Sequence, residues 1–345
     1  MKFHKYHGLG NDYIVIDPKE SGMPLDSQTI KLICDRNYGA GSDGILYGPE
    51  IIGDMFGLRI FNPDGSEAEK SGNGQRIFSR YLWDKGMVNE NEFTIKTLGG
   101  IVKSQIMENA KFVKVEMGKV SFNAEDIPVF NETGECIQKK LEVNGRAFTY
   151  NAATIGNPHC IIIMDEISPE MTKKYGPLIE NNPKFLNRTN VQFMKIVDET
   201  NVQIEIWERG AGYTLASGSS STAAAAVAYK LKRCKNKISV RMQGGELSIC
   251  FNDDFQATMI GPVTAVYDGE LRMKYLKKLF TNNFVAYSKS PYRKKCSMTN
   301  KSDRIAVNLR KKSTVQEHKI RTYKKRNLSF AFNINLSIIH KFGTA

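Results

Sequence analysis

Two distant stretches of the sequence follow the same order of local elements. A strand-like run at residues 58–61 leads through a polar turn to a Ser-Gly pair at 71–72 and then to a helix-like segment. A second run at 204–207 leads through another polar turn to a Ser-Gly pair at 217–218 and a further helix-like segment. Their identity is too low for a sequence repeat. We interpret them as two versions of one design, which predicts two pseudo-symmetric halves.

Short strand-like runs outnumber helical segments in the rest of the body. Gly, Asn and Asp separate these runs, as turns between strands require. The pattern predicts an α+β fold and disfavours a doubly wound parallel sheet. The expected strands are 13–17, 58–61, 93–97, 112–117, 160–164, 202–207, 237–242 and 247–251. The expected helices are 27–35, 75–85 and 221–233.

Composition excludes several classes of chain. With 41% hydrophobic and 25% charged residues over 345 positions, it is typical of a globular protein with real cores. The strongest apolar runs, 160–164 and 223–228, are far shorter than the roughly 20 residues that cross a bilayer. The first 13 residues carry no apolar run, so we expect no signal peptide. Six cysteines without CxxC pairs predict reduced thiols in a cytoplasm.

Positive charge gathers at one end of the chain. Residues 277–345 hold 17 basic and two acidic side chains, whereas the whole protein carries a formal charge of +13. Such a segment is expected to be disordered. Its charge would favour nucleic acid or anionic lipid, but no folded nucleic-acid module accompanies it. Specific nucleic-acid binding is therefore the weaker alternative to a solvated extension.

We expect three regions along the chain. Periodicity is lost over residues 126–148, where the two halves should meet. The predicted division is an N-terminal half over 1–130, a C-terminal half over 131–276 and the basic tail over 277–345.

Each Ser-Gly pair is a candidate anion-binding site. A glycine-bearing turn before a helix exposes unpaired backbone N–H groups at the positive end of the helix dipole. Ser, Asn and Gly are also ordinary helix caps without further function. Two such turns in facing halves would enclose one carboxylate or phosphate between them.

Polar side chains accompany these turns. Glu208 and Arg209 could hold an ammonium and a carboxylate, the arginine through its bidentate fork, although a surface ion pair is an equal alternative. Four asparagines lie beside strands in turn-like segments and are further candidates for the pocket, although each could form only an ordinary Asx turn. They are Asn11, Asn62, Asn157 and Asn190.

Five ordered motifs resemble the diaminopimelate epimerase family. They are His-Gly-Leu-Gly-Asn-Asp at 7–12, Asn-Pro-Asp-Gly-Ser-Glu at 62–67, Gly-Asn-Gly at 72–74, Gly-Asn-Pro-His-Cys at 156–160 and Glu-Arg-Gly-Ala-Gly at 208–212. The resemblance covers residues 1 to about 276. It implies an amino-acid epimerase that needs no cofactor or metal and acts in lysine and cell-wall precursor synthesis. It also implies two halves, each with curved strands around a central helix, and a site in the cleft between them.

The resemblance assigns roles residue by residue. His159 and Glu208 match positions tied to catalysis, and Ser71 and Ser217 match the two proton-transfer positions. The expected contacts to the α-carboxylate are the backbone at Gly72, Asn73, Gly218 and Ser219. The expected contacts to the rest of the substrate are Asn11, Asn62, Asn157, Asn190, Glu208 and Arg209. A homodimer is one alternative for the oligomeric state.

The sequence departs from the family at both proton-transfer positions, where the family carries cysteine. Inversion at an α-carbon without pyridoxal phosphate needs one group to remove a proton and another to deliver one on the opposite face. A thiol has a pKa of about 8.5, against about 15.7 for water as a guide to a hydroxyl. A helix end contributes only about 0.3 to 2 kcal/mol. Ser71 and Ser217 would therefore need a neighbouring base, for which His159 and Glu208 are the candidates.

Two further departures concern the pocket, where the family usually carries Phe-Asp-Gln and Gly-Glu-Thr. This chain has Ser-Asp-Gly at 42–44 and Gly-Tyr-Thr at 212–214. The leading hypothesis is a diaminopimelate-type epimerase that binds substrate and turns it over weakly or not at all. The alternatives are an enzyme with both cysteines changed, a racemase for another amino acid, and a catalytically silent amino-acid-binding paralogue.

Overall fold

Strands dominate the structure, as the sequence predicts. The computed structural model describes residues 1–22 and 25–272. Within this part, the strands join one sheet system and the helices are few, which confirms the α+β prediction. The predicted basic tail lies outside the described residues, so its disorder and its affinity for nucleic acid stay predictions.

The first half of the described chain runs from β1 to β8 and contains three helices. Its strands are β1 (Lys2–Gly8), β2 (Asn11–Ile16), β3 (Ile45–Ile52), β4 (Met55–Phe61), β5 (Glu67–Ala68), β6 (Phe93–Thr97), β7 (Gly100–Met107) and β8 (Phe112–Lys119). Its helices are α1 (Pro18–Ser21), α2 (Ser27–Cys34) and α3 (Gly72–Asp84).

The second half repeats the pairing of curved strands with a central helix. Its strands are β9 (Lys139–Val143), β10 (Arg146–Thr154), β11 (Pro158–Ile163), β12 (Asn190–Ile196), β13 (Asn201–Glu208), β14 (Gly212–Thr214), β15 (Lys237–Met242), β16 (Gly245–Phe251), β17 (Gln256–Gly261) and β18 (Thr264–Glu270). Its helices are α4 (Pro169–Glu180) and α5 (Gly218–Lys230).

The last two strands return to the first half. β18 pairs antiparallel with β1, and β17 pairs antiparallel with β8. The described residues accordingly fall within one compact unit. The predicted boundary at residues 130–131 lies in the irregular segment between β8 and β9, and the division into halves stays a prediction.

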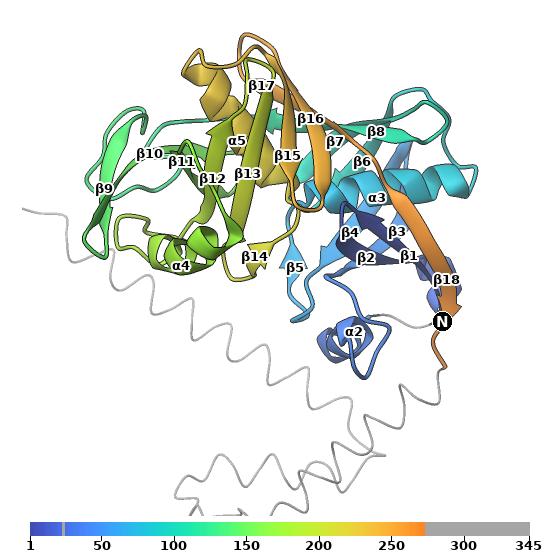
Figure 1. Ribbon diagram of the computed structural model, residues 1–345. Coiled ribbons are helices and arrows are strands. Elements are labelled where there is room, and N and C mark those ends of the chain that lie inside the picture. Colours follow the sequence, from blue (N-terminus) through green and yellow to red (C-terminus); the bar gives the residue numbers. More distant parts are fainter. Residues whose placement is uncertain (23–24, 273–345) are drawn as a thin grey trace, which may run out of the picture. The chain divides into compact units, whose positions relative to one another are not determined.

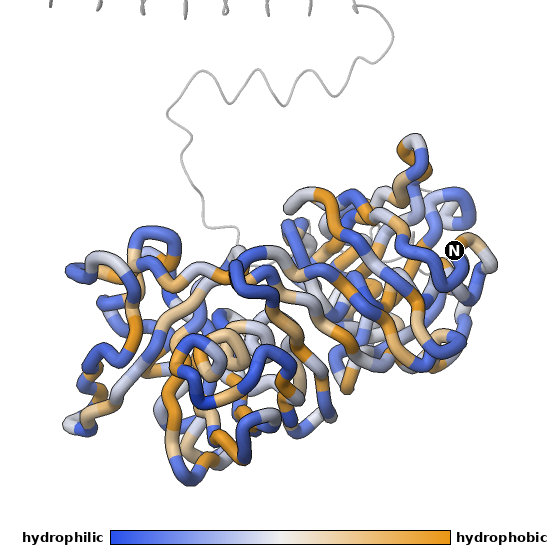
Figure 2. Tube along the Cα trace, turned by 90° about the horizontal axis from the view of Figure 1, so that it is seen from above, coloured by the Kyte–Doolittle hydropathy of each residue, from blue (hydrophilic) through white to orange (hydrophobic). Residues whose placement is uncertain are grey.

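The two long helices α3 and α5 lie inside the strands (Figure 1). Hydrophilic and hydrophobic residues are interspersed along the trace (Figure 2), and burial alternates in β7, where every second side chain from Val102 to Ile106 is buried. Helix α5 is buried on nearly every side because its residues 223–228 are small, five alanines and one valine. The small side chains let the surrounding strands approach the helix, so its N-terminus is held rigidly in the core.

The alanines of α5 predict a strong response to added volume. Replacing fully buried Ala225 with leucine should destabilise the protein by about 1–3 kcal/mol, because a close-packed core has no room for the larger side chain. Urea unfolding would measure the change. Ala147→Leu, at an exposed position near the start of β10, is the matched control and should stay within about 0.5 kcal/mol. Equal midpoints for the two variants would contradict this account of the helix.

Candidate active site

Serines cap the two central helices at corresponding positions. Ser71 precedes α3, and its Oγ accepts a hydrogen bond from the Gly74 N–H at 3.0 Å. Ser217 precedes α5, and its Oγ accepts from the Ser220 N–H at 3.4 Å. Each hydroxyl satisfies one of the N–H groups that a helix start leaves unpaired. The local chemistry of the Ser-Gly pairs therefore sets where both helices begin.

The two helix starts meet. A Cβ atom built on Gly218 would lie 3.5 Å from Gly72 Cα and 3.0 Å from Met259 Sδ. A Cβ on Gly72 would lie 3.1 Å from Met259 Cε. Glycine at both positions therefore permits the close approach of the two backbones. The positive ends of two helix dipoles point at one place, which favours an anion there.

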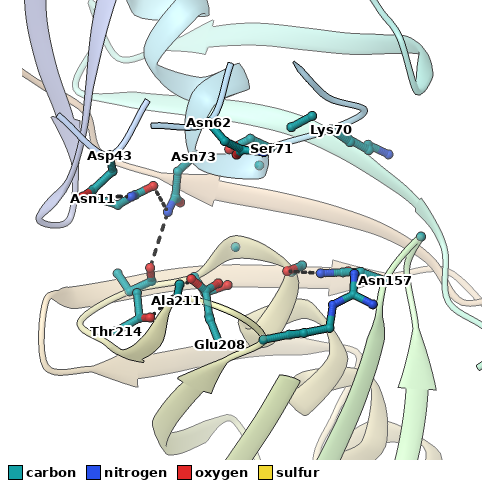
Figure 3. A pocket seen from close by; sticks show the side chains of 18 of the residues that line it. Asn11, Asp43, Asn62, Lys70, Ser71, Asn73, Asn157, Glu208, Ala211 and Thr214 are labelled. Carbon is teal, nitrogen blue, oxygen red and sulfur yellow. Dashed lines mark hydrogen bonds between the residues drawn. The ribbon is translucent and has the colours of Figure 1, made fainter. Parts of the chain in front are cut away.

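A cavity of about 1100 Å³ opens where these helices meet. Figure 3 shows side chains from both halves facing it, with Ser71 and Asn73 from one half and Glu208 and Asn157 from the other. The sequence-predicted residues that line it are Asn11, Asn62, Ser71, Gly72, Asn73, Asn157, Glu208, Arg209, Ser217, Gly218 and Ser219. His159 and Asn190 lie behind the wall and do not line it.

Asn73 ties the two helix starts together. Its Nδ2 donates to Asn11 Oδ1 at 3.0 Å and lies 3.5 Å from the carbonyl oxygen of Ala216, the residue before Ser217 (Figure 3). Asn11 Nδ2 in turn donates to Asp43 Oδ2 at 2.9 Å. Because Asn73 is buried, these bonds hold the first turn of α3 against the segment before α5.

His159 lies behind the cavity wall and contacts Asn157, which lines the cavity. The ring is fully buried, and its Nε2 lies 3.0 Å from Asn157 Oδ1. Asn157 Nδ2 donates to Ser219 Oγ at 3.4 Å. Burial lowers the pKa of His159 to about 3, so the imidazole is neutral at physiological pH. The structure therefore brings His159 to Asn157, and neither Ser71 nor Ser217 is its hydrogen-bond partner.

Asn190 likewise supports the wall through the backbone. Its Oδ1 accepts from the Arg209 N–H at 2.9 Å, and its Nδ2 donates to the Pro158 carbonyl oxygen at 2.9 Å. Both ends of the buried amide are thereby used. Arg209 itself reaches the cavity, and its Nη1 donates to the Asn187 carbonyl oxygen at 2.9 Å. Asn190 thus positions the arginine from outside the cavity.

Glu208 is the carboxylate on the α5 side of the cavity. Removal from water raises its pKa, and hydrogen bonds from the Ser217 and Thr214 hydroxyls partly oppose this rise. The Thr214 Oγ1 donates to Glu208 Oε2 at 3.3 Å. A carboxylate whose pKa is raised is a stronger base than an exposed one. The Ser217 hydroxyl therefore has a carboxyl of raised pKa beside it.

Two lining residues were missed by the sequence analysis. Tyr13 follows the first motif on β2, and its hydroxyl lies 3.1 Å from Ser71 Oγ. Lys70 immediately precedes Ser71, and its Nζ donates to the Met117 carbonyl oxygen at 2.6 Å. Their positions next to singled-out residues were the available signal. With Lys70 and Arg209 against Glu208 and Asp43, the cavity carries charges of both signs, which suits a zwitterion.

A buried cation lies beneath the helix starts. Arg76 of α3 is fully buried, and its Nη1 donates to Met259 Sδ at 3.1 Å. Burial lowers its pKa to about 10, so the guanidinium keeps its charge at neutral pH. Met259 separates it from Gly72 and Gly218. Its charge adds to the positive field of the two helix ends.

The cavity wall contains no cysteine within the described residues. The five cysteines in this part of the chain are free thiols away from the wall: Cys34, Cys136, Cys160, Cys234 and Cys250. In the same part, no cluster of His, Cys, Asp and Glu is arranged to hold a metal ion. None of the described helices combines the length and the apolar character needed to cross a membrane.

Comparisons with known proteins agree with this geometry. The family model of diaminopimelate epimerase matches residues 3–123 and 151–266. Diaminopimelate epimerase 2 from Nostoc sp. is 59% identical over 272 residues, covering 79% of this chain and 95% of the relative. Diaminopimelate epimerase from Caldanaerobacter subterraneus is 39% identical over 277 residues, covering 79% of this chain and all of the relative.

Solved structures share the fold at low identity. A hydroxyproline epimerase from Agrobacterium vitis with bound trans-4-hydroxy-L-proline gives a TM-score of 0.59 at 13% identity, covering 78% of this chain and 91% of that one. A phenazine biosynthesis protein of the PhzF family from Bacillus anthracis gives 0.56 at 16% identity, covering 79% and 99%.

The family match and the relatives define the class of protein, a cofactor-independent amino-acid epimerase, and two similar helix starts around one polar cavity fit it. The chain belongs to the diaminopimelate epimerase family. The resemblance predicted from its five motifs is thereby confirmed.

Proposed function

We propose that the protein binds diaminopimelate in the cytoplasm and interconverts its LL and meso isomers slowly, with Ser71 and Ser217 as the proton-transfer groups. The observation that carries the proposal is the convergence of two serine-capped helix starts on one cavity, where Gly72 and Gly218 nearly touch. A reacting α-carbon held at this place has one hydroxyl on either side.

The substrate's α-carboxylate belongs at the paired helix starts. Backbone N–H groups of Gly72, Asn73, Gly218 and Ser219 lie in the first turns of α3 and α5, where an anion meets two helix dipoles. The far end of diaminopimelate carries a second ammonium and carboxylate. Asn62 and Arg209, both on the cavity wall, are the groups we assign to that end.

Proton transfer follows from the two serines. As the α C–H bond breaks, its electron pair moves into the carboxylate, whose growing charge the helix ends stabilise. Ser217 passes the proton to Glu208, whose raised pKa suits a general base. A proton delivered through Ser71 on the other face completes inversion. A hydroxyl is a poor acid and base at neutral pH, so turnover is slow.

The finer organisation is also proposed. We assign residues 1–130 and 131–276 to the two halves and leave the basic residues 277–345 outside the catalytic unit. A homodimer, and weak nucleic-acid contact through that basic segment, remain the partner predictions.

Binding and exchange together test the proposed function. Calorimetry should show binding of LL- or meso-diaminopimelate but not of lysine, which lacks the second carboxylate. In deuterated water, NMR should show slow loss of the α-proton signal and slow appearance of the other isomer. Binding without any exchange would instead indicate a silent amino-acid-binding protein. Failure of both isomers to bind would overturn the substrate assignment.

A further inference from the structure

Ser71 has a different partner from Ser217. Among the described residues, the Ser71 hydroxyl has the Tyr13 hydroxyl at 3.1 Å and the Gly74 N–H at 3.0 Å as its hydrogen-bond partners. Ser217 instead shares the cavity wall with Glu208, and its hydroxyl lowers the pKa of that carboxyl. One cap thus has a phenol beside it, which can give up a proton, and the other has a carboxylate, which can accept one.

Tyr13 can reach Ser71 because residue 44 is glycine. A Cβ atom built on Gly44 would lie 2.7 Å from Cε1 of the Tyr13 ring and 2.6 Å from the Phe61 carbonyl oxygen. Any larger side chain there would displace the tyrosine. The ring is buried and lines the cavity. Tyr13 therefore lies between the departure at 42–44 and the serine at 71 and contacts both.

We propose that Tyr13 is a positioning residue that supplies the proton delivered by Ser71, while Ser217 and Glu208 form the opposing proton-removing pair. The inference rests on the proposed function and deepens it. It makes the two faces of the site chemically unequal.

The protons balance over one inversion. The α C–H bond breaks, Ser217 accepts this proton and its own passes to Glu208. On the opposite face the electron pair on carbon takes the Ser71 proton, and Ser71 recovers one from the Tyr13 hydroxyl. This leaves a protonated Glu208 and a Tyr13 phenolate. Glu208 then loses a proton to water and Tyr13 gains one from water, which restores the resting site without an oxidant or reductant.

The acidity of the phenol fits this task. Burial, and the nearby carboxylates of Glu208, Asp43 and Asp12, raise the pKa of Tyr13 to about 12, while its bond to Ser71 opposes the rise. Tyr13 is therefore protonated at neutral pH. It remains a stronger acid than an alcohol, for which water at about 15.7 is the guide. Recovering the proton from Tyr13 is easier than leaving an alkoxide on Ser71.

Because the two sides of the site differ chemically, the two isomers should exchange their α-hydrogen with solvent at different rates. The isomer whose α-hydrogen faces Ser217 should exchange with deuterated water through Glu208 alone, without inversion. The other isomer would require a Tyr13 phenolate and should exchange slowly. Exchange without inversion is a signature that a merely structural role for Tyr13 would not produce.

The test is Tyr13→Phe, assayed with LL- and meso-diaminopimelate separately by NMR and chiral chromatography. We expect inversion to fall about tenfold or more while the faster of the two exchange reactions is retained. Ser71→Cys added to Tyr13→Phe should restore inversion, because a thiol at that position needs no phenol. Tyr6→Phe, which removes a hydroxyl bonded to Asp84 outside the cavity wall, is the control and should change neither rate.

Several results would overturn the inference. An inversion rate that Tyr13→Phe leaves unchanged would overturn it. So would an equal loss of exchange and inversion in Tyr13→Phe, if this variant has the same melting temperature as the parent. Slow inversion by the parent that continues unchanged in Tyr13→Phe would remove only the relay and leave the proposed function standing. Absence of both exchange and inversion in the parent would remove both.

Discussion

Replacing Ser71 and Ser217 together with cysteine is expected to raise the epimerisation rate by about a thousandfold or more. Both residues cap helices whose first turns meet in one cavity. Cysteine in the same places would hold its sulfur at the positive helix ends, where a thiolate is favoured. Initial rates with LL-diaminopimelate, followed by chiral chromatography, measure the change.

The expected size follows from acidity. A thiol and a hydroxyl differ by about 7 pKa units when water is the guide, and each unit corresponds to about tenfold in an equilibrium. If roughly half of this difference is expressed in the transition state, the gain exceeds a thousandfold. Glu208 and Tyr13 make the serine form faster than an unaided hydroxyl, which reduces the gain but does not cancel it.

A matched control separates acidity from packing. Ser79→Cys changes a buried serine two turns further along α3, outside the cavity wall, and should leave the rate unchanged. Substrate affinity should be similar in the parent and the double variant, because the helix N–H groups are retained. A double variant no faster than the parent would mean that hydroxyl acidity does not limit turnover.

Local signals predicted the helix starts only in part. The expected helices began at Gln75 and Ser221, yet α3 and α5 begin at Gly72 and Gly218. Glycine has a low helix propensity, so the sequence pattern placed the starts one turn late. The serine caps satisfy the first-turn N–H groups and let glycine occupy those positions. The Ser-Gly pairs at 71–72 and 217–218 were nevertheless predicted as anion sites, because helix capping depends on residues that are adjacent in the sequence.

Contacts between distant residues could not be predicted. Tyr13 reaches Ser71 only because Gly44 leaves space for the ring, which is a property of packing. His159 and Asn190 were expected in the pocket through their motifs, but the parallel pairing of β11 with β12 places them side by side behind it. There they orient Asn157 and the Arg209 backbone. A motif indicates that a residue matters without giving the direction of its side chain.

Strand pairing shows the same limit. Strands at 93–97 and 237–242 were predicted with the observed bounds, since their alternation is local. The return of β18 to β1 joins residues more than 250 positions apart and leaves no local trace. Those pairings close the sheet around α3, so the rigidity of the site depends on the least predictable part of the fold.

Glu208→Gln is expected to reduce α-proton exchange by about a hundredfold or more, because the amide cannot accept the proton that Ser217 passes on. In the parent, exchange should rise with pH as Glu208 ionises. This rise should lie above the usual carboxyl range, since burial raises the pKa of Glu208. The variant should lack that rise. Initial exchange rates in deuterated buffers across the acidic to neutral range provide the measurement.

The same substitution should stabilise the fold at neutral pH. A carboxyl group whose pKa is higher in the folded than in the unfolded state destabilises the protein once it ionises. The free energy of unfolding therefore falls as pH rises from the pKa of the unfolded state through the pKa of the folded state. Glu208→Gln removes that loss, so its advantage in urea unfolding should be absent at low pH and grow through this window. Glu246→Gln, an exposed change of equal charge on β16, should show neither effect. A Glu208→Gln variant that is more stable than the parent at neutral pH would show that Glu208 is kept buried for proton transfer, at a cost in stability. Unfolding free energies that change with pH in parallel for parent and variant would mean that the base is another residue.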